Sequence, residues 1–341
     1  MQIGMVGLGR MGMNMARRLL CGSQGVVAYN RTYAKTEALA REGATAARTL
    51  AELVQQLAPP RVVWMMLPQG PPTEEHFQEL LSLLGSGDVL VDGGNTHYRD
   101  DQRRAAQARE TGVLYVDAGV SGGIWGLEEG YCLMVGGPEE AFRHLEPALT
   151  ALAPAEGYLY CGRSGAGHFV KMVHNGIEYA MMEALGEGFE LLAASEYAEG
   201  LDLQKVAHLW NQGSVIRSWL LELAERAFAE DPRLEKIAGY VEDSGEGRWA
   251  VQAATELGVA APGLAGALFK RFLSRQQEAF SNQVIAALRL QFGGHMVAET
   301  GETHHRVCGA GAGRTQPATP ETEGVPPASG PGGERRGEAS E

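Results

Sequence analysis

The sequence predicts an α/β protein in which an N-terminal Rossmann-type, doubly wound parallel sheet is followed by an all-helical C-terminal domain. Over residues 1–163, short β-branched runs alternate with stretches of helical spacing, a pattern typical of βαβ units. A glycine-rich turn follows the first of these runs. From 164 to 297 the apolar residues keep helical periodicity without a strand pattern, which predicts a helical substrate and dimerisation domain.

Seven short apolar runs in the first domain are predicted strands. Helical stretches such as 99–111 separate most of them. Continuous apolar runs of this kind are typical of strands buried on both faces of a parallel sheet. The predicted strands are 3–8, 26–30, 62–67, 89–92, 114–118, 132–137 and 158–162.

The second domain is predicted to begin with a long helix over 165–195. At about 1.5 Å per residue it would be on the order of 45 Å long, and such a helix often forms the spine of a dimer interface. From 298 to 341 the sequence is rich in Gly, Pro, Thr and Glu. Such a segment buries too little surface to offset its ordering entropy, so it is predicted to be a disordered tail.

Composition excludes several classes of protein. The formal net charge of −13 argues against a nucleic-acid partner. The chain opens directly on a strand pattern and has no apolar run long enough to cross a bilayer, so a cytoplasmic protein without a membrane partner is predicted. The cysteines lie far apart without metal-ligand spacing, and free thiols with no bound metal are predicted; they are Cys21, Cys132, Cys161 and Cys308.

The glycine-rich turn, Gly7-Leu8-Gly9-Arg10-Met11-Gly12, lies between the first predicted strand and a helix. In this pattern Gly7 permits the tight turn, Gly9 lets the backbone approach a pyrophosphate, and Gly12 lets the helix pack closely on the strand. The helix N-terminus offers N–H groups and a positive dipole end to the phosphates. The alternative is a turn needed only for packing, and the surrounding βαβ alternation favours a dinucleotide site.

The second predicted strand ends in Asn30-Arg31-Thr32, where an NAD-binding site normally has Asp or Glu for the ribose 2′-hydroxyl. A carboxylate would repel a 2′-phosphate, whereas a guanidinium can bind phosphate through two hydrogen bonds. The residues therefore favour NADP. NAD remains the alternative if Arg31 is only a solvated loop residue.

The segment from Gly167 to Tyr179 carries a polar stripe on an otherwise apolar helix. Lys171, His174, Asn175 and Glu178 stand at i, i+3, i+4 and i+7 and share one helical face. The stripe must therefore face a cavity or be paired internally, and a Lys171–Glu178 contact is the structural alternative. Two helical turns, roughly 10 Å, separate that pair, which suits an acid and a base acting on different atoms of one substrate. A desolvated lysine can act as a general base.

The neighbouring apolar positions of this helix are predicted to be buried; they are Phe169, Val170, Met172, Val173, Ile177, Ala180 and Met181.

Three further segments are candidates for anion binding. Asp92-Gly93-Gly94-Asn95-Thr96 and Val120-Ser121-Gly122-Gly123 each follow a predicted strand, at the sheet edge where ligands bind in such folds. A hydroxyl followed by two glycines offers several N–H groups to a carboxylate. Near the end of the helical domain, Arg289 to His295 combines two cationic side chains with a turn. That ending fits either a phosphate site or a helix C-cap, and spacing alone does not choose between them.

Together these motifs resemble the 6-phosphogluconate dehydrogenases, in the short form of that family. The likeness runs from Met1 to about His295, and GHFVKMVHNGIEY is its most specific part. It implies oxidative decarboxylation of 6-phosphogluconate to ribulose 5-phosphate and CO₂ with NADP or NAD, in the pentose phosphate pathway. It also implies a homodimer or homotetramer with shared active sites.

The resemblance assigns a role to individual residues. Lys171 would be the general base for the substrate 3-hydroxyl, and Glu178 the acid that protonates the enediol. The sugar acid would be held by Asn95, Ser121, Gly122, Gly123, His174, Asn175 and Tyr179. The cofactor would be held by Gly7, Leu8, Gly9, Arg10, Met11, Gly12, Asn30, Arg31 and Thr32, with Leu67, Pro68, Gln69 and Asn95 near the nicotinamide. The substrate phosphate would be bound by Arg289 and His295 of a neighbouring subunit and by Arg271.

The chain departs from the long form of the family at one place. Where the long form has a phosphate-binding lysine, this chain reads Ser244-Gly245-Glu246-Gly247-Arg248-Trp249. Ser244 is uncharged and Glu246 has the wrong sign for a phosphate, so either Arg248 replaces the lysine or the contact is missing.

Two other functions stay open as alternatives. A β-hydroxyacid dehydrogenase of the 3-hydroxyisobutyrate or tartronate-semialdehyde type shares the glycine turn, the Ser-Gly-Gly loop and a helix lysine, but needs no phosphate ligands. A non-catalytic NADP-binding sensor would need the glycine turn without Lys171 and Glu178.

Overall fold

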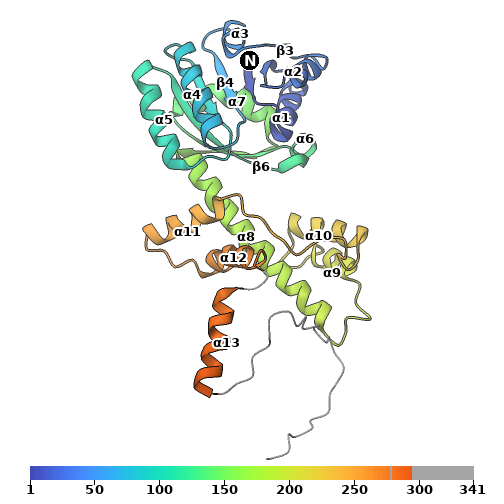
Figure 1. The fold of residues 1–341 in the computed structure, drawn as a ribbon. Coiled ribbons are helices and arrows are strands. Elements are labelled where there is room, and N and C mark those ends of the chain that lie inside the picture. The colour runs from blue at the N-terminus through green and yellow to red at the C-terminus, as the bar shows by residue number, and fades with distance from the viewer. Residues whose placement is uncertain (277–278, 294–341) are drawn as a thin grey trace, which may run out of the picture. The chain divides into compact units, whose positions relative to one another are not determined.

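The computed structural model describes residues 1–276 and 279–293 of the chain, and residues 1–285 form one compact unit. The N-terminal part of this unit is built on one eight-stranded sheet with the strand order β3-β2-β1-β4-β5-β6-β7-β8 (Figure 1). The strands are β1 (Gln2–Val6), β2 (Gly25–Tyr29), β3 (Thr45–Ala46), β4 (Val62–Met65), β5 (Val89–Asp92), β6 (Leu114–Ser121), β7 (Cys132–Gly136) and β8 (Tyr158–Gly162).

All seven predicted strands are present, and the Rossmann-type α/β fold is confirmed. The predicted parallel arrangement has one exception, because β7 runs antiparallel to β6 while β8 is parallel to β7. The link from Ser121 to Cys132 holds only the short helices η1 (Gly123–Trp125) and α6 (Gly126–Glu129). A parallel crossover needs a dozen or more residues, so the chain returns antiparallel. The two-residue strand β3 was not predicted.

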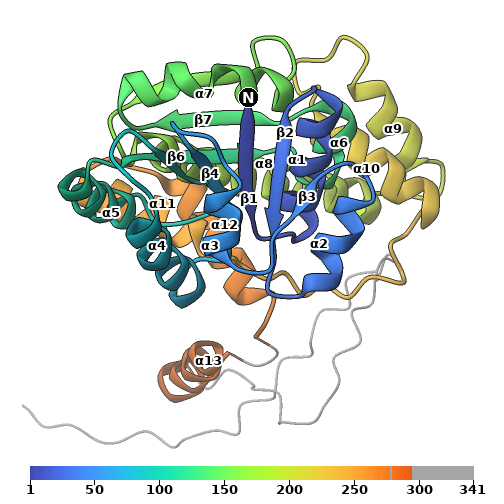
Figure 2. The ribbon, with the colours of Figure 1, turned by 90° about the horizontal axis from the view of Figure 1, so that it is seen from above.

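Helices cover both faces of the sheet (Figure 2). On one face α1 (Arg10–Cys21) and α7 (Glu139–Leu152) bury apolar side chains such as Met15 and Leu145 against Ile3 and Val116. On the other face α3 (Leu50–Gln55), α4 (Pro71–Leu83) and α5 (Tyr98–Thr111) pack in the same way. The short helix α2 (Tyr33–Ala40) follows β2. Burial on both faces explains why the strands read as continuous apolar runs.

The helix α8 (Ala166–Ala194, 29 residues) leads from the sheet into the helical part of the chain (Figure 1). It matches the long helix predicted over 165–195. Small apolar cores pack along it: Met172 contacts α11, Tyr179 contacts α12, and Phe189 contacts α9 and α10. The remaining helices are α9 (Leu203–Trp210), α10 (Trp219–Glu230), α11 (Glu246–Glu256), α12 (Pro262–Leu273) and α13 (Phe280–Gly293).

The described residues from 164 onward contain helices and no strand, as predicted for the C-terminal domain. The predicted domain boundary at 163 and 164 falls in the link between β8 and α8. The predicted tail, 298–341, lies outside the described residues. Among the helices that the structure describes, none is long and apolar enough to cross a membrane.

Candidate active site

The glycine-rich turn joins β1 to α1 at the carboxyl end of the sheet. Gly7 has a φ of +95°, and a Cβ there would lie 2.5 Å from the carbonyl oxygen of Met66. A Cβ on Gly12 would lie 2.1 Å from the carbonyl oxygen of Gly7. Both positions therefore require glycine, the first for its backbone conformation and both for space. A Cβ on Gly9 would meet nothing within 4 Å, so the turn is open on that side.

This geometry fits a dinucleotide diphosphate. Helix α1 begins at Arg10 and no side chain caps its N-terminus, so the first backbone N–H groups are free for an anion at the positive end of the helix dipole. Asn30 braces the turn: its Oδ1 accepts the N–H of Leu8 at 2.9 Å, and its Nδ2 donates to the carbonyl oxygen of Thr32 at 3.1 Å. Arg31 and Thr32 are exposed at the end of β2.

A cavity of about 1130 Å³ lies between the carboxyl end of the sheet and one side of α8. Residues from the predicted cofactor site and from the predicted sugar site line it together. The predicted site residues on its wall are Gly9, Met11, Gly12, Leu67, Asn95, Ser121, Gly122, Gly123, Lys171, His174, Asn175 and Glu178.

The polar stripe on α8 faces this cavity. Lys171 is 7 % exposed, and its Nζ lies 3.4 Å from Nδ1 of His174. His174 is the centre of the stripe: its Nδ1 lies 3.2 Å from Oδ1 of Asn175 and 3.8 Å from Oε2 of Glu178, and its Nε2 lies 3.2 Å from Oγ of Ser121. The histidine therefore stands between the lysine and the glutamate, and these two do not pair directly.

Burial adjusts the protonation of the two cationic groups. Loss of solvent lowers the pKa of Lys171, and the charges of Glu178 and Glu246 offset part of that effect. Burial, followed by the charge of Lys171, lowers the pKa of His174. Both shifts favour the neutral forms, which are the forms able to accept a proton.

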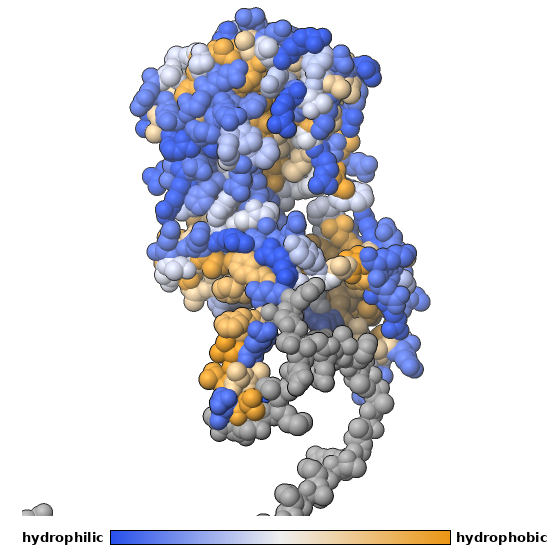
Figure 3. Space-filling view, in the orientation of Figure 1, coloured by the Kyte–Doolittle hydropathy of each residue, from blue (hydrophilic) through white to orange (hydrophobic). Residues whose placement is uncertain are grey.

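The apolar positions beside the stripe are not all buried, and that prediction is wrong for one side of the helix. Met172 is buried, but Val170, Val173, Ile177 and Met181 are 40 %, 37 %, 50 % and 41 % exposed. These four residues follow helical spacing, so they form an apolar strip that lines the cavity next to the polar stripe. Figure 3 shows further apolar side chains at the surface of the helical part.

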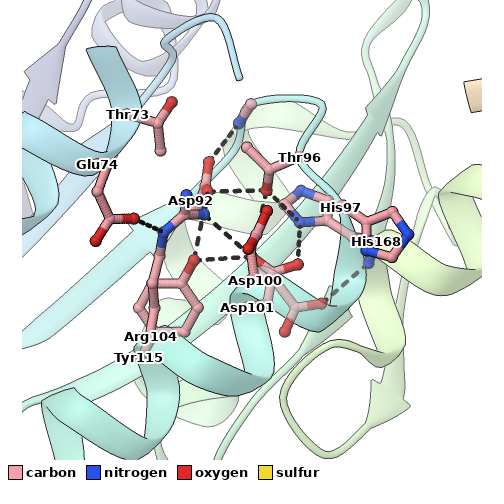
Figure 4. Close-up of polar contacts among 12 residues, drawn as sticks. Thr73, Glu74, Asp92, Thr96, His97, Asp100, Asp101, Arg104, Tyr115 and His168 are labelled. Atoms are coloured by element: carbon pink, nitrogen blue, oxygen red, sulfur yellow. Dashed lines mark hydrogen bonds and ion pairs between the residues drawn. The ribbon is translucent and has the colours of Figure 1, made fainter. Parts of the chain in front are cut away.

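A buried network of charged side chains fixes the start of α8 to the sheet (Figure 4). His168 Nδ1 lies 2.8 Å from Oδ2 of Asp101 and 3.2 Å from Oγ1 of Thr96. Arg104 Nη1 donates to Oδ2 of Asp92 at 3.2 Å, and the Tyr115 hydroxyl donates to Oδ1 of Asp101 at 2.8 Å. The network was not predicted from the sequence; its only local signal is the acid–base spacing of Asp101 and Arg104 in a helix.

A carboxylate from β6 completes this anchor. Asp117 accepts the N–H of Gly165 at 2.6 Å and the N–H of His168 at 3.0 Å, at the N-terminus of α8. Burial, followed by the nearby charge of Asp101, raises the pKa of Asp117 to about 6. Since Lys171 follows His168 by three residues, one helical turn, these contacts determine where the lysine lies.

The cluster of Asp92, Asp101 and His168 has the residue types of a metal site. Its oxygens, however, already accept hydrogen bonds from Thr96, Arg104, Tyr115 and the backbone. The Arg104 guanidinium supplies positive charge within the cluster. The arrangement is that of an internal ion network.

The segment that departs from the long form lies at the start of α11. Arg248 is bound by the carboxylate of Asp243 at 2.7 and 3.0 Å. Glu246 is 4 % exposed, and its carboxylate accepts hydrogen bonds from Nδ2 of Asn95 and from the hydroxyl of Ser244. The approach of Glu246 to Asn95 was not predicted.

The predicted phosphate ligands have different surroundings. The Arg271 guanidinium lies 3.4 Å from the centre of the Tyr179 ring, and its Nη1 donates to the carbonyl oxygen of Glu242 at 2.8 Å. The Tyr179 hydroxyl lies 3.4 Å from Oγ of Ser244. Arg289 is part of α13, and His295 lies outside the described residues.

Comparison with known proteins finds the same family along nearly the whole described chain. Residues 2–162 match the NAD-binding domain of 6-phosphogluconate dehydrogenase, and residues 167–291 match the C-terminal domain of 6-phosphogluconate dehydrogenase. YqeC of Bacillus subtilis, named after the same dehydrogenase, is 45 % identical over 86 % of this chain and 98 % of its own. The NAD⁺-dependent decarboxylating 6-phosphogluconate dehydrogenase of Haloferax volcanii is 44 % identical over 87 % of this chain and 99 % of its own.

A solved structure has the same fold over most of the chain. The 6-phosphogluconate dehydrogenase of Plasmodium falciparum, studied with NADP⁺ and with 6-phosphogluconate, superimposes with a TM-score of 0.74 at 28 % identity. The match covers 89 % of this chain and 67 % of that protein.

Proposed function

The chain belongs to the 6-phosphogluconate dehydrogenase family, and we propose that it converts 6-phosphogluconate to ribulose 5-phosphate and CO₂ with a nicotinamide dinucleotide. The observation that supports this most strongly is the shared cavity. One wall is the glycine turn that fits a diphosphate, and the other is the stripe with Lys171, His174 and Glu178.

Lys171 is the base that starts the reaction. Burial lowers its pKa, which favours the neutral amine that takes the proton of the 3-hydroxyl. A bound nicotinamide supplies the acceptor for the hydride that leaves C3. The protonated Lys171 then stabilises the 3-carbonyl oxygen, which accepts the electron pair released as CO₂ leaves.

Glu178 acts at a different carbon. It delivers a proton to C1 of the enediol, which yields ribulose 5-phosphate. His174 lies between the two groups and, with Ser121 and Asn175, holds substrate hydroxyl groups. This division of roles explains why the acid and the base are two helical turns apart.

The direct test is steady-state turnover of 6-phosphogluconate with NADP and with NAD, with CO₂ and ribulose 5-phosphate measured as products. 3-Hydroxyisobutyrate with the oxidised cofactor, and tartronate semialdehyde with the reduced cofactor, serve as comparison substrates, because they lack the phosphate. Turnover of either of these but not of 6-phosphogluconate would favour the β-hydroxyacid alternative. Binding of NADP without any turnover would favour a sensor.

We predict a higher kcat/KM with NADP than with NAD. The amide of Asn30 is engaged by the backbone, no carboxylate ends β2, and Arg31 is exposed there. Charge-assisted hydrogen bonds to a 2′-phosphate are worth roughly a factor of ten or more. Arg31→Ala is expected to lower kcat/KM for NADP more than for NAD, and Arg41→Ala, an exposed residue just after α2, is the matched control. The Haloferax volcanii relative is NAD⁺-dependent by name, and a preference for NAD here would refute the prediction.

The proposal includes an assembly of at least two subunits with shared active sites, located in the cytoplasm. Arg289 and His295 fit the family ending that binds the phosphate in a neighbouring subunit. Lys171→Ala and Arg289→Ala chains, each weakly active alone, are therefore expected to regain activity when mixed, because one of the two shared sites in each mixed dimer would have both residues intact. Subunit exchange is verified with differently tagged chains. Exchange without regained activity would contradict shared sites.

A further inference from the structure

Glu246 places a buried carboxylate beside the cavity, although the proposed substrate is an anion. The side chain belongs to the first turn of α11, is 4 % exposed, and contacts only the amide of Asn95 and the hydroxyl of Ser244 among the hydrogen-bonding groups of the described residues. Burying a charge is costly unless it is hydrogen-bonded. The two hydrogen bonds from Asn95 and Ser244 therefore stabilise this buried carboxylate, and its role follows from these two partners.

The position of Glu246 is fixed by α8. The N–H of Ser244 donates to the Tyr179 hydroxyl at 3.3 Å. Gly245 has a φ of +107°, and a Cβ on Gly247 would lie 2.5 Å from the Tyr179 ring. The turn into α11 thus packs directly on Tyr179, and a chain of contacts runs from Tyr179 through Ser244 and Glu246 to Asn95.

Asn95 lies at the other end of that chain, on the cavity wall. Two hydrogen bonds to Asp92 fix the loop that carries Asn95. Asp92 Oδ1 accepts one from the N–H of Gly94 at 2.9 Å, and Asp92 Oδ2 accepts the other from the hydroxyl of Thr96 at 3.0 Å. The backbone is therefore set, and the remaining freedom of Asn95 is the orientation of its side-chain amide. An amide presents a donor at Nδ2 and an acceptor at Oδ1, while an ionised carboxylate can only accept.

We propose that Glu246 is a positioning residue which holds Nδ2 of Asn95 and thereby presents Oδ1 of Asn95 to the cavity as a hydrogen-bond acceptor. This inference rests on the proposed function. Oδ1 then accepts a hydrogen bond from a donor on the bound molecule. Two groups could be that donor: a hydroxyl of the sugar acid, or the carboxamide N–H of the nicotinamide. Glu246 is thus not a phosphate ligand; its carboxylate accepts a hydrogen bond from the neighbouring amide of Asn95.

The central test is a rescue experiment at this pair. Asn95→Asp keeps the shape of the side chain, but its carboxylate then faces the Glu246 carboxylate, and neither can donate a hydrogen bond. The Kd of the ligand that binds to this side chain is therefore expected to rise at least about tenfold. Adding Glu246→Gln supplies an amide that can donate to the new carboxylate, so the double variant is expected to recover most of the loss. Glu246→Gln alone still accepts from Asn95 in one of two orientations and is expected to change Kd by only about twofold.

Binding of 6-phosphogluconate and binding of NADP are titrated separately. The ligand whose Kd changes is the one that donates the hydrogen bond to Asn95. Glu256→Gln is the matched control, because Glu256 lies in the same helix and pairs with exposed Arg99. A double variant that binds no better than Asn95→Asp alone, with each variant melting as one transition, would overturn the inference.

A second readout separates positioning from mere structural support. The groups that act on the charge of Lys171 are Glu178 and His174 on α8, Glu246 on α11 and Cys132 on β7. Because the Glu246 carboxylate raises the pKa of Lys171, Glu246→Gln is expected to move the acid limb of the kcat/KM profile to lower pH. An unmoved limb would show that Glu246 does not face the site. Lack of wild-type turnover would instead refute the proposed function, while the NADP titrations would still test the pair.

Discussion

Lys171→Ala is expected to lower kcat for 6-phosphogluconate by about 10²–10⁴-fold, the range typical of a general base. Lys171 is buried at the cavity wall with its Nζ 3.4 Å from His174. Among the stripe residues only His174 could also accept the proton, and its pKa is lowered too, so some residual activity is expected to depend on it. Single-turnover formation of reduced cofactor measures the oxidation step directly.

Glu178→Gln is expected to affect the later step instead. Hydride transfer should remain partly intact, while ribulose 5-phosphate appears more slowly because protonation of C1 is impaired. Reduced cofactor and ribulose 5-phosphate are therefore followed separately in one turnover. Lys205→Ala and Glu187→Gln, exposed residues in α9 and α8, are the matched controls. Near-normal turnover of Lys171→Ala would mean that the stripe is structural and that the mechanism is wrong.

The pH dependence has a defined sign. In the proposed mechanism the neutral form of Lys171 is the active one, and burial lowers the pKa of this group below its ordinary value of 10.5. The kcat/KM profile is therefore expected to rise with pH through that lowered pKa. An acid limb placed at the ordinary lysine value would indicate a solvated, unperturbed lysine.

Much of the fold follows from local patterns, because burial on both faces leaves continuous apolar runs and one helix fixes the spacing of its own side chains. The stripe from Lys171 to Glu178 was predictable for the second reason. The direction of β7 was not predictable, because the strand predicted over 114–118 is shorter than β6 (Leu114–Ser121) and left a link long enough for a parallel crossover. The strand β3 was not predictable either, because so short a pairing leaves no pattern in the sequence.

Contacts between distant segments explain what the sequence did not predict in the site. Asn95 and Glu246 are 151 residues apart, and Asp101 and His168 are 67 residues apart. No local spacing brings such pairs together; the sheet edge and the packing of α11 on α8 do. The exposed strip of Val170, Val173, Ile177 and Met181 has the same cause, because hydropathy does not distinguish a helix face on a core from one on a cavity.

His168→Ala is expected to lower the free energy of unfolding by about 3–5 kcal/mol, the cost of removing one partner of a buried ion pair. The mutation leaves Asp101 buried without its cation, although Arg104 and Tyr115 remain near it. Asp101→Ala should cost a similar amount, and the double variant less than the sum, because neither charge is then stranded. The Glu139–Arg143 pair, exposed on α7, is the control and should contribute no more than about 1 kcal/mol.

His168 also makes the free energy of unfolding depend on pH. Burial opposes its charge, but the carboxylates of Asp101, Asp92 and Asp117 outweigh that effect and raise the pKa of His168 from 6.5 to about 10. A pKa raised by folding contributes stability that is fully present below pH 6.5 and is lost as pH rises through about 10. Urea unfolding of the wild-type chain is therefore expected to show a decline in stability between pH 7 and pH 10 that His168→Ala lacks. A decline of equal size in both proteins would mean that His168 is neutral in the folded state and that the start of α8 is held by Asp117 and the hydrogen bonds alone.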